Sequence, residues 1–326
     1  MIITRTPLRV SFFGGGSDFS YYYKTYGGAV LSSSINKFIY VNLNKKFEGG
    51  FRISYSENEY VESLDQIKHK IIRESLLSRN VKDNLEIVTV ADIPSKGTGL
   101  GSSSAFTVGL LSALNAFYKQ NVSKYNLANE SSSVEICLCN EPIGKQDHFA
   151  SCFGGFNLIK FNQDDSTQVI PIINKDGVIE ALEDNLLIFY TGLTRNASEI
   201  LKIQTNLIQN DTKKLDILHK MVNLVHVAAE CLSSQNLKAF GEALDLNWAY
   251  KKELSDEISN SMIDDCYQKA KKNGALGGKI LGAGAGGFLL LFAPKNKHLN
   301  IIKALSNLKL LDFKFESQGS TVIYKD

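Results

Sequence analysis

The chain has 326 residues, of which 44% are hydrophobic, and its 36 basic and 34 acidic side chains give a formal net charge of +2. This length allows one large or two medium cores, and the balanced charge provides no general field to attract nucleic acid or a membrane. The five cysteines form no even disulfide framework, and the residues after Met1 show no signal-peptide pattern or long apolar span. We therefore expect a cytoplasmic protein with a small-molecule ligand; the sequence leaves its oligomeric state open.

The first expected element is a strand that ends in a glycine-rich turn. Its residues alternate as in a strand with one face in the core, with Leu8, Val10 and Phe12 on one side and Arg9, Ser11 and Phe13 on the other. The turn Gly14–Ser17 and then Asp18 follow. Without other motifs, the simpler interpretation is favoured for both residues: Arg9 is a solvated strand residue, and Asp18 caps a loop. Further strands are expected to about residue 55, followed by helix to about residue 79.

Residues 85–117 predict a strand, a glycine loop and a helix in that order. Leu85–Val90 is rich in β-forming residues. The helical spacing after the loop gives one apolar face, formed by Phe106, Leu110, Leu114 and Phe117. Gly97, Gly99 and Gly101 can adopt backbone angles closed to other residues, so successive N–H groups can point into one concavity. A helix N-terminus aimed at the same place favours an anion with several oxygens, such as a phosphate.

This loop is not a Walker A motif. Lys96 precedes the first glycine, whereas the P-loop pattern places a lysine after the last one. Glycine and serine are also ordinary loop residues, and Ser102 is a candidate helix cap. If the site binds a nucleotide, the chain is not a P-loop enzyme.

Residues 135–147 offer two carboxylates, Glu135 and Asp147, after the helical stretch 125–134. Phosphoryl transfer needs charge neutralisation by a metal and a group that orients or deprotonates the attacking hydroxyl, and these residue types supply both. The alternative for each is a surface salt bridge. Lys145 is either a phosphate contact or, more simply, solvated. Three nearby cysteines and His148 lack the spacing of a structural zinc site.

The second half of the chain is expected to begin after the polar turn 162–167, with a division near residues 165–185. Leu186–Tyr190 predicts a strand, and Arg195 follows it, where an arginine can grip the phosphate of a sugar phosphate or lie free in solvent. Helices are expected to about residue 272. Ile280–Phe292 returns to strand, and Phe313–Tyr324 predicts a final strand pair around Gly319.

The segment around Gly282, Gly284 and Gly287 matches the dinucleotide fingerprint Gly-x-Gly-x-x-Gly. That motif requires a following helix, whereas Phe288–Phe292 is a continuous apolar run that predicts a buried strand. The context therefore argues against an NAD-dependent oxidoreductase. A glycine turn between strands either brings N–H groups close to a substrate or only allows close packing.

Three segments together resemble the GHMP kinases, a family named for galactokinase, homoserine kinase, mevalonate kinase and phosphomevalonate kinase. Pro94–Ala105 resembles the family's second motif, Thr6–Phe19 its N-terminal motif and Lys279–Phe292 its C-terminal glycine motif. The Gly-Gly-Gly-Ser-Asp and Gly-Lys-Gln-Asp forms are similar to the branch that contains fucokinase and heptose 7-phosphate kinase. This resemblance spans nearly the whole chain.

The resemblance implies an α+β, two-domain GHMP kinase fold with a ribosomal protein S5 domain 2-like N-terminal part, residues 1–184, and a ferredoxin-like C-terminal lobe, residues 185–326. It implies ATP and Mg²⁺ as cofactors, Asp147 and Arg9 as catalytic residues, and Ser103 with Glu135 as metal ligands. The implied ATP-binding residues are Lys96, Gly97, Thr98, Gly99, Leu100, Gly101, Ser102, Ser103 and Ser104. The candidate substrate-binding residues are Gly16, Ser17, Asp18, Arg195, Gly284 and Ala285.

The branch implies transfer of the ATP γ-phosphate to the anomeric hydroxyl of D-glycero-D-manno-heptose 7-phosphate. The product, a 1,7-bisphosphate, leads to nucleotide-activated heptose and surface polysaccharide. A fucokinase-like enzyme acting on an unphosphorylated sugar is the first alternative. A non-catalytic sensor of ATP and sugar is an alternative of another class, although the presence of Arg9, Glu135 and Asp147 argues against it.

Overall fold

The computed structural model of the protein describes residues 1–94, 97–194 and 197–326, and it contains two sheets. In the described part of the chain, the larger sheet has eight strands in the order β12-β1-β2-β5-β3-β4, with β6 beside β2 and β7 beside β6. The smaller sheet has the order β11-β8-β10-β9. All pairings are antiparallel except β3 with β5. Runs of antiparallel strands with segregated helices confirm the predicted α+β class.

The strands have the following bounds: β1 Ile2–Phe13, β2 Gly28–Lys45, β3 Phe51–Ser54, β4 Asn58–Val61, β5 Leu85–Ala91, β6 Phe156–Phe161, β7 Thr167–Pro171, β8 Leu186–Tyr190, β9 Gly277–Ile280, β10 Phe288–Phe292, β11 Lys309–Leu311 and β12 Thr321–Lys325. The α-helices are α1 Ser20–Tyr26, α2 Lys70–Ser78, α3 Ser102–Phe117, α4 Lys124–Ser133, α5 Gln146–Phe153, α6 Val178–Asp184, α7 Ala197–Asn210, α8 Thr212–Ser233, α9 Leu237–Leu254, α10 Ser261–Lys272 and α11 His298–Ala304.

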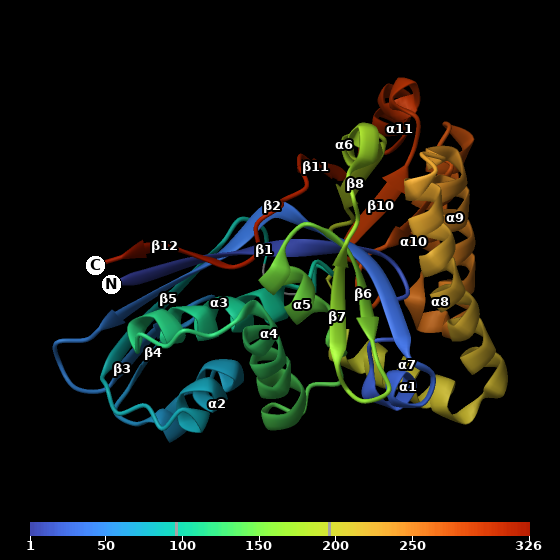
Figure 1. The fold of residues 1–326 in the computed structure, drawn as a ribbon. Helices are drawn as coiled ribbons and strands as arrows, with labels where there is room; N and C mark the ends of the chain where they lie inside the picture. The colour runs from blue at the N-terminus through green and yellow to red at the C-terminus, as the bar shows by residue number, and fades with distance from the viewer. Residues whose placement is uncertain (95–96, 195–196) are drawn as a thin grey trace.

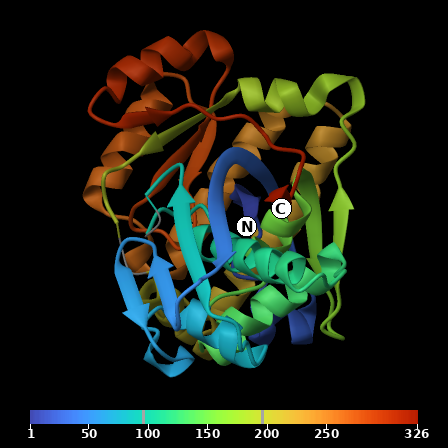
Figure 2. The same cartoon turned by 90° about the vertical axis from the view of Figure 1, so that its left-hand side faces the viewer.

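The two sheets belong to different parts of the molecule (Figures 1 and 2). Helix α3 lies along the larger sheet with α2 and α4 on its other side, and α8, α9 and α10 stand beside β8 and β10 of the smaller sheet (Figure 1). The smaller sheet begins at Leu186, although β12 near the end of the chain returns to pair with β1. The boundary expected at residues 184 and 185 therefore stays a prediction.

A shared hydrophobic core joins the two parts next to the end of β1. The Phe240 ring on α9 lies 5.8 Å from Phe12, 5.3 Å from Phe13 and 6.1 Å from Phe292, measured between ring centroids. Phe12 and Phe13 lie at a bulge of β1, and the strand is continuously buried from Thr6 to Phe13. β1 is therefore covered on both faces, which fixes the position of Arg9 and Ser11 within it.

Two expected elements differ from the structure. Residues 55–69 were predicted to be helical, but they contain β4 and the short 3₁₀ turn Leu64–Gln66, and α2 begins only at Lys70. The strand pair expected around Gly319 is also absent from the described tail, because β12 pairs with β1. A side chain at Gly319 would lie 1.9 Å from the Cys152 carbonyl oxygen. This glycine therefore permits close packing against α5 and does not turn a hairpin.

Candidate active site

A cavity of about 220 Å³ lies where β1, the loop before α3, the start of α5 and segments of the C-terminal part meet. Most of the polar residues that the sequence analysis named as candidates line this cavity. Two lysines that the sequence analysis did not name also line it. The lining residues used below are Arg9, Ser11, Gly16, Asp18, Gly97, Thr98, Gly99, Gly101, Ser102, Ser103, Ser104, Glu135, Gln146, Asp147, Lys251, Lys279, Gly282 and Ala283. A cavity with several converging polar groups is the usual form of a small-molecule site.

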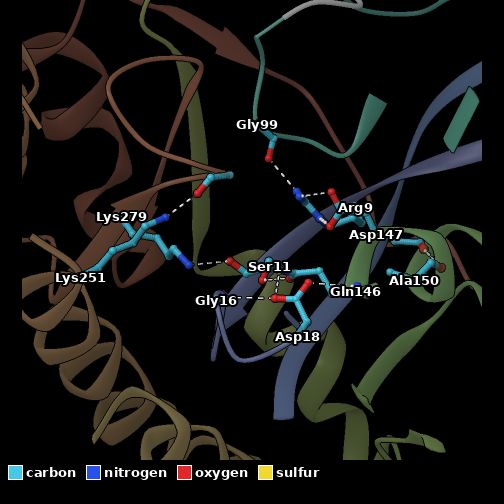
Figure 3. Close-up of polar contacts among 12 residues, drawn as sticks. Arg9, Ser11, Gly16, Asp18, Gly99, Gln146, Asp147, Ala150, Lys251 and Lys279 are labelled. Atoms are coloured by element: carbon cyan, nitrogen blue, oxygen red, sulfur yellow. Dashed lines mark hydrogen bonds and ion pairs between the residues drawn. The ribbon is translucent and has the colours of Figure 1, made fainter. Parts of the chain in front are cut away.

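Arg9 and Asp147 form a bidentate ion pair in this cavity (Figure 3). The Arg9 Nε donates to one Asp147 carboxylate oxygen at 2.6 Å, and Nη2 donates to the other at 2.7 Å. The third donor, Nη1, reaches the Gly99 carbonyl oxygen at 2.6 Å. Arg9 is 4% exposed, whereas 21% of the Asp147 side chain is exposed. The carboxylate is therefore held in a fixed orientation and still reaches a ligand.

The loop before α3 has the backbone geometry expected of a phosphate cradle. Gly97, Gly99 and Gly101 all have positive φ, at 67°, 76° and 76°. Gly101 caps α3 without a side-chain hydrogen bond, so Ser102 is the first helical residue and not the cap. The N–H groups of the first helical turn then remain available to an anion.

The C-terminal glycine motif packs directly beneath this loop. A Cβ on Gly282 would lie 2.5 Å from the Gly99 Cα, and one on Gly287 would lie 2.4 Å from the Thr98 carbonyl oxygen. Such contacts require glycine on both sides. Phe288–Phe292 follows as strand β10, as predicted, so no dinucleotide fold forms here. Gly282 and Ala283 also reach the cavity wall.

Glu135 lies in a dense hydrogen-bond network within a π-helical turn, Val134–Leu138, at the end of α4. Its carboxylate accepts from Ser103 Oγ at 2.7 Å and Thr107 Oγ1 at 2.7 Å, and it lies 2.9 Å from His148 Nε2. Burial alone would raise the pKa of this carboxyl. The charge and hydrogen bond of His148, with the two hydroxyls, outweigh burial and lower its pKa below 4.5. Glu135 is therefore a buried carboxylate that remains ionised.

Asp18 and its partners line the opposite end of the cavity (Figure 3). One carboxylate oxygen accepts from the Gln146 backbone N–H at 3.1 Å, and the other accepts from Gln146 Nε2 and the Gly16 N–H, both at 3.1 Å. Ser11 Oγ donates to Gln146 Oε1 at 2.8 Å. Burial, followed by the nearby Asp147 charge, raises the pKa of Asp18. These groups form a rigid array that suits hydroxyl groups of a ligand.

Lys251 on α9 and Lys279 on β9 complete the cavity from the C-terminal side. The Lys279 Nζ donates to the Ser11 and Phe12 carbonyl oxygens at 3.0 and 3.2 Å, and the Lys251 Nζ donates to the Gly282 carbonyl. Lys251 is 6% exposed and Lys279 is 2% exposed. The sequence analysis missed both. The signal for Lys279 was a single charge within a glycine-rich, apolar strand, while Lys251 stands among other polar helix residues and gave none.

A second cavity, of about 760 Å³, adjoins the first, and Ser102 and Ser103 line both. Its other walls are largely apolar or aromatic and come from β2, β5 and α3 and from the segment before α2, with Ile39, Tyr55, His69, Ile93 and Phe106 among them. Its size and lining suit a flat heteroaromatic group attached to the phosphates in the cradle. The sequence gave no indication of this slot, because its residues come from several separate elements.

Several predicted residues have other positions. Lys96 and Arg195 lie outside the described residues. Ser17 is fully buried, and its hydroxyl donates to the Gly14 and Ala29 carbonyls. The Ala285 N–H bonds to the Ile258 carbonyl at 2.8 Å, and the same carbonyl lies 2.8 Å from a Cβ placed on Gly284. Ser17, Gly284 and Ala285 are absent from the described lining of both cavities, and their assignment as substrate contacts remains only a prediction.

The structure shows the contacts of Lys145 and His148, for which the sequence analysis left more than one interpretation open. Lys145 pairs with Asp165, and its Nζ lies 5.2 Å from the centre of the Tyr23 ring. Lys145 is therefore not simply solvated. It is also not one of the described residues that line the first cavity. His148 pairs with Glu135 and not with the neighbouring cysteines.

The described residues contain no helix long and apolar enough to cross a membrane.

Known proteins match the chain along nearly its whole length. Residues 65–155 match the GHMP kinases N-terminal domain, and residues 228–308 match the GHMP kinases C-terminal domain. D-glycero-alpha-D-manno-heptose 7-phosphate kinase of Campylobacter jejuni is 32% identical over 332 residues, covering 98% of this chain and 97% of that protein. The chain belongs to the GHMP kinase family. It is therefore a kinase, and its family uses ATP as the phosphate donor.

Other GHMP kinases support the same fold. L-fucokinase/L-fucose-1-P guanylyltransferase of Bacteroides fragilis is 26% identical over 330 residues, which cover 89% of this chain and 34% of that longer protein. The crystal structure of a D-glycero-D-manno-heptose 1-phosphate kinase from Bacteroides thetaiotaomicron superposes with a TM-score of 0.81 at 23% identity and covers 100% of both chains. The predicted two-domain GHMP kinase fold is thereby confirmed.

Proposed function

We propose that this GHMP kinase transfers the γ-phosphate of ATP to the anomeric hydroxyl of D-glycero-D-manno-heptose 7-phosphate, giving the 1,7-bisphosphate. The relative from C. jejuni, which is named for this substrate, aligns over almost the entire chain. The product would feed nucleotide-activated heptose and surface polysaccharide synthesis. The single observation that carries the chemistry is the Arg9–Asp147 pair, held between the phosphate cradle and the Asp18 array.

In this proposal the nucleotide phosphates bind the loop 97–104, and the base occupies the adjoining apolar slot. Asp147 accepts a hydrogen bond from the attacking hydroxyl and orients it toward the γ-phosphate. Arg9 holds that carboxylate through two parallel hydrogen bonds and places a positive charge beside the transferred group. Asp18 and Gln146 hold the sugar hydroxyls.

The residues also fit a magnesium ion. Ser103 Oγ and a Glu135 carboxylate oxygen lie 2.7 Å apart beside the cradle, and the lowered pKa keeps that carboxylate ionised. Magnesium prefers oxygen ligands and few protein groups, so these two residues would hold it. When bound, the ion would neutralise charge on the phosphate oxygens. His148 and Thr107 fix the other Glu135 oxygen, which leaves its orientation independent of the ligand.

The test is ADP release from ATP and magnesium with a panel of free hexoses, heptoses and their terminal phosphates. We expect turnover with the heptose 7-phosphate, and a loss of at least about 10³-fold in Asp147→Ala. The exposed Asp216→Ala serves as the control and should match the native chain. Turnover on free fucose alone would retain the kinase but replace the substrate. ATP binding without any turnover would instead indicate the non-catalytic sensor.

A further inference from the structure

The wall that the C-terminal part contributes to the cavity carries two buried lysines without an acidic partner. In the described chain, 1–94, 97–194 and 197–326, neither Lys251 nor Lys279 has a carboxylate oxygen within 4.0 Å of its ammonium group. Their hydrogen bonds go only to backbone carbonyls. Burying an ammonium group without a counter-charge is costly, so a purely structural role for two such groups at one cavity is unfavourable.

These lysines have hydrogen-bonding capacity to spare. An ammonium group has three donors. Lys251 uses one, on the Gly282 carbonyl, and Lys279 uses two, on the Ser11 and Phe12 carbonyls. In the described contacts, two N–H donors of Lys251 and one of Lys279 therefore have no acceptor. Both residues line the cavity. Three donors and two positive charges suit a tetrahedral anion such as phosphate.

Lys279 lies further along β1 than Arg9, the residue that contacts the nucleotide cradle, whereas Lys251 bonds the Gly282 carbonyl next to that cradle. Arg9 contacts that cradle through the Gly99 carbonyl, whereas Lys279 contacts β1 two and three residues further on. Two residues of strand correspond to about 7 Å. Figure 3 shows the lysines on one side of Ser11 and the Arg9–Asp147 pair on the other, with Gly16 and Asp18 below. Lys279 thus belongs to the half of the cavity that faces Asp18, and Lys251, whose charge acts on Lys279, lies near it.

We propose that Lys251 and Lys279 form an anion subsite that holds the phosphate already carried by the sugar acceptor. The inference rests on the proposed function and adds to it the groups that distinguish a phosphorylated acceptor from a free sugar. Burial and the neighbouring Arg9 charge lower the pKa of Lys251 to about 8, and burial and the charges of Lys251 and Arg9 lower the pKa of Lys279. A bound phosphate relieves this repulsion, so its binding is favoured by the cluster as a whole.

The first test measures binding of inorganic phosphate by calorimetry, using the native chain saturated with a non-hydrolysable ATP analogue and magnesium. The nucleotide fills the cradle, so phosphate that still binds must occupy another subsite. We expect one phosphate to bind per nucleotide-loaded chain. No phosphate binding to the loaded native chain would overturn the proposal, and this outcome requires no variant to fold.

The variants Lys251→Met and Lys279→Met then locate the subsite. Methionine retains an unbranched chain of similar length and removes a buried charge, so folding should be preserved. Each variant should weaken phosphate binding to the loaded chain by about 10- to 100-fold, the effect of losing a charged hydrogen bond. The control is Lys238→Met on the same helix, where the side chain is 75% exposed. Native phosphate affinity in both buried-lysine variants would overturn the proposal.

Kinetics separate the two possible sources of the phosphate. With a sugar phosphate acceptor, the lysine variants should raise the KM for that acceptor by about 10- to 100-fold and leave the KM for ATP within about twofold of native. A rise confined to the KM for ATP would assign the lysines to the nucleotide and overturn the subsite. If the chain fails to turn over the heptose phosphate but still binds phosphate through these lysines, the substrate proposal fails and the subsite stands for another phosphorylated acceptor.

Discussion

The two walls of the candidate active site differ in whether their charged side chains have an oppositely charged partner. On the N-terminal wall each carboxylate that we propose for catalysis or metal binding already has a partner, Arg9 for Asp147 and His148 for Glu135. On the C-terminal wall, the described contacts of Lys251 and Lys279 are to carbonyl oxygens alone. Paired groups maintain a fixed geometry for chemistry, whereas groups without a counter-charge gain most from a ligand. We therefore propose that the N-terminal wall carries out the reaction and holds the sugar hydroxyls, and that the C-terminal wall holds the phosphate of the acceptor.

The largest expected effect comes from the N-terminal wall. Asp147→Asn should lower kcat by about 10³-fold with little change in acceptor KM, because an amide cannot accept the hydroxyl proton. Steady-state ADP release would separate this from Lys279→Met, which should act on KM. An Asp147→Asn variant that changes only KM would contradict the proposed role of the N-terminal wall in the reaction.

Glu135→Gln tests the buried pair on the same wall. It removes the buried carboxylate oxygen that pairs with His148 and Thr107, and should lower the free energy of unfolding by about 3 kcal/mol at pH 7. Because folding lowers the Glu135 pKa, its contribution is present above pH 4.5 and is lost as pH falls through the lowered value. Urea unfolding should therefore show the native and variant curves converging under strong acid. A gap that widens with acid would contradict this assignment.

Arg9→Lys asks whether the two parallel hydrogen bonds matter or only the charge. Lysine keeps the charge but cannot make the planar, bidentate contact with Asp147, so kcat should fall by about 30-fold. Arg52→Lys is a matched control, since Arg52 pairs with Glu86 at 2.7 Å on a partly exposed surface. It should stay within about twofold of native. Equal effects at both positions would indicate general destabilisation.

The smallest effect tests how the C-terminal glycine motif supports the cradle. Gly282→Ala places a Cβ 2.5 Å from the Gly99 Cα and should cost about 2 kcal/mol of stability and weaken ATP binding. Gly192→Ala is the control: its φ of 74° is also positive, but no atom of the described residues lies within 4 Å of the added Cβ. That change should cost about 1 kcal/mol from backbone strain alone, with ATP affinity unchanged. Thermal unfolding and nucleotide titration measure both.

Local patterns predicted the elements that carry their own signal. The strand, loop and helix of residues 85–117 follow from β-forming residues, glycines and helical spacing, and the structure contains all three. Phe288–Phe292 was correctly predicted as a strand because it is continuously apolar. Residue type made Glu135 and Asp147 candidates, but which role belongs to Arg9, Glu135 and Asp147 could be proposed only from the family resemblance. Their close approach depends on β1, α4 and α5 meeting in three dimensions.

Non-local pairing explains the elements that were predicted wrongly. β4 forms because β3 joins β5, about thirty residues away, and β12 forms because β1 offers a free edge at the opposite end of the chain. β4 itself pairs locally with β3, but no short window of sequence contains β3 with β5 or β12 with β1. The lysine subsite was missed for a similar reason: burial of Lys251 depends on α9 packing against Gly282, which its neighbours in sequence do not show.

The backbone contact between Gly282 and Gly99 also couples nucleotide binding to the stability of the contact between the two parts of the molecule. A nucleotide at 100 times its Kd would stabilise the folded state by about 2.7 kcal/mol. Since the loop it grips rests on the turn between β9 and β10, part of that energy must appear as resistance to separation of the two sheets. Amide hydrogens in the smaller sheet should then exchange more slowly with nucleotide present, although they never touch it.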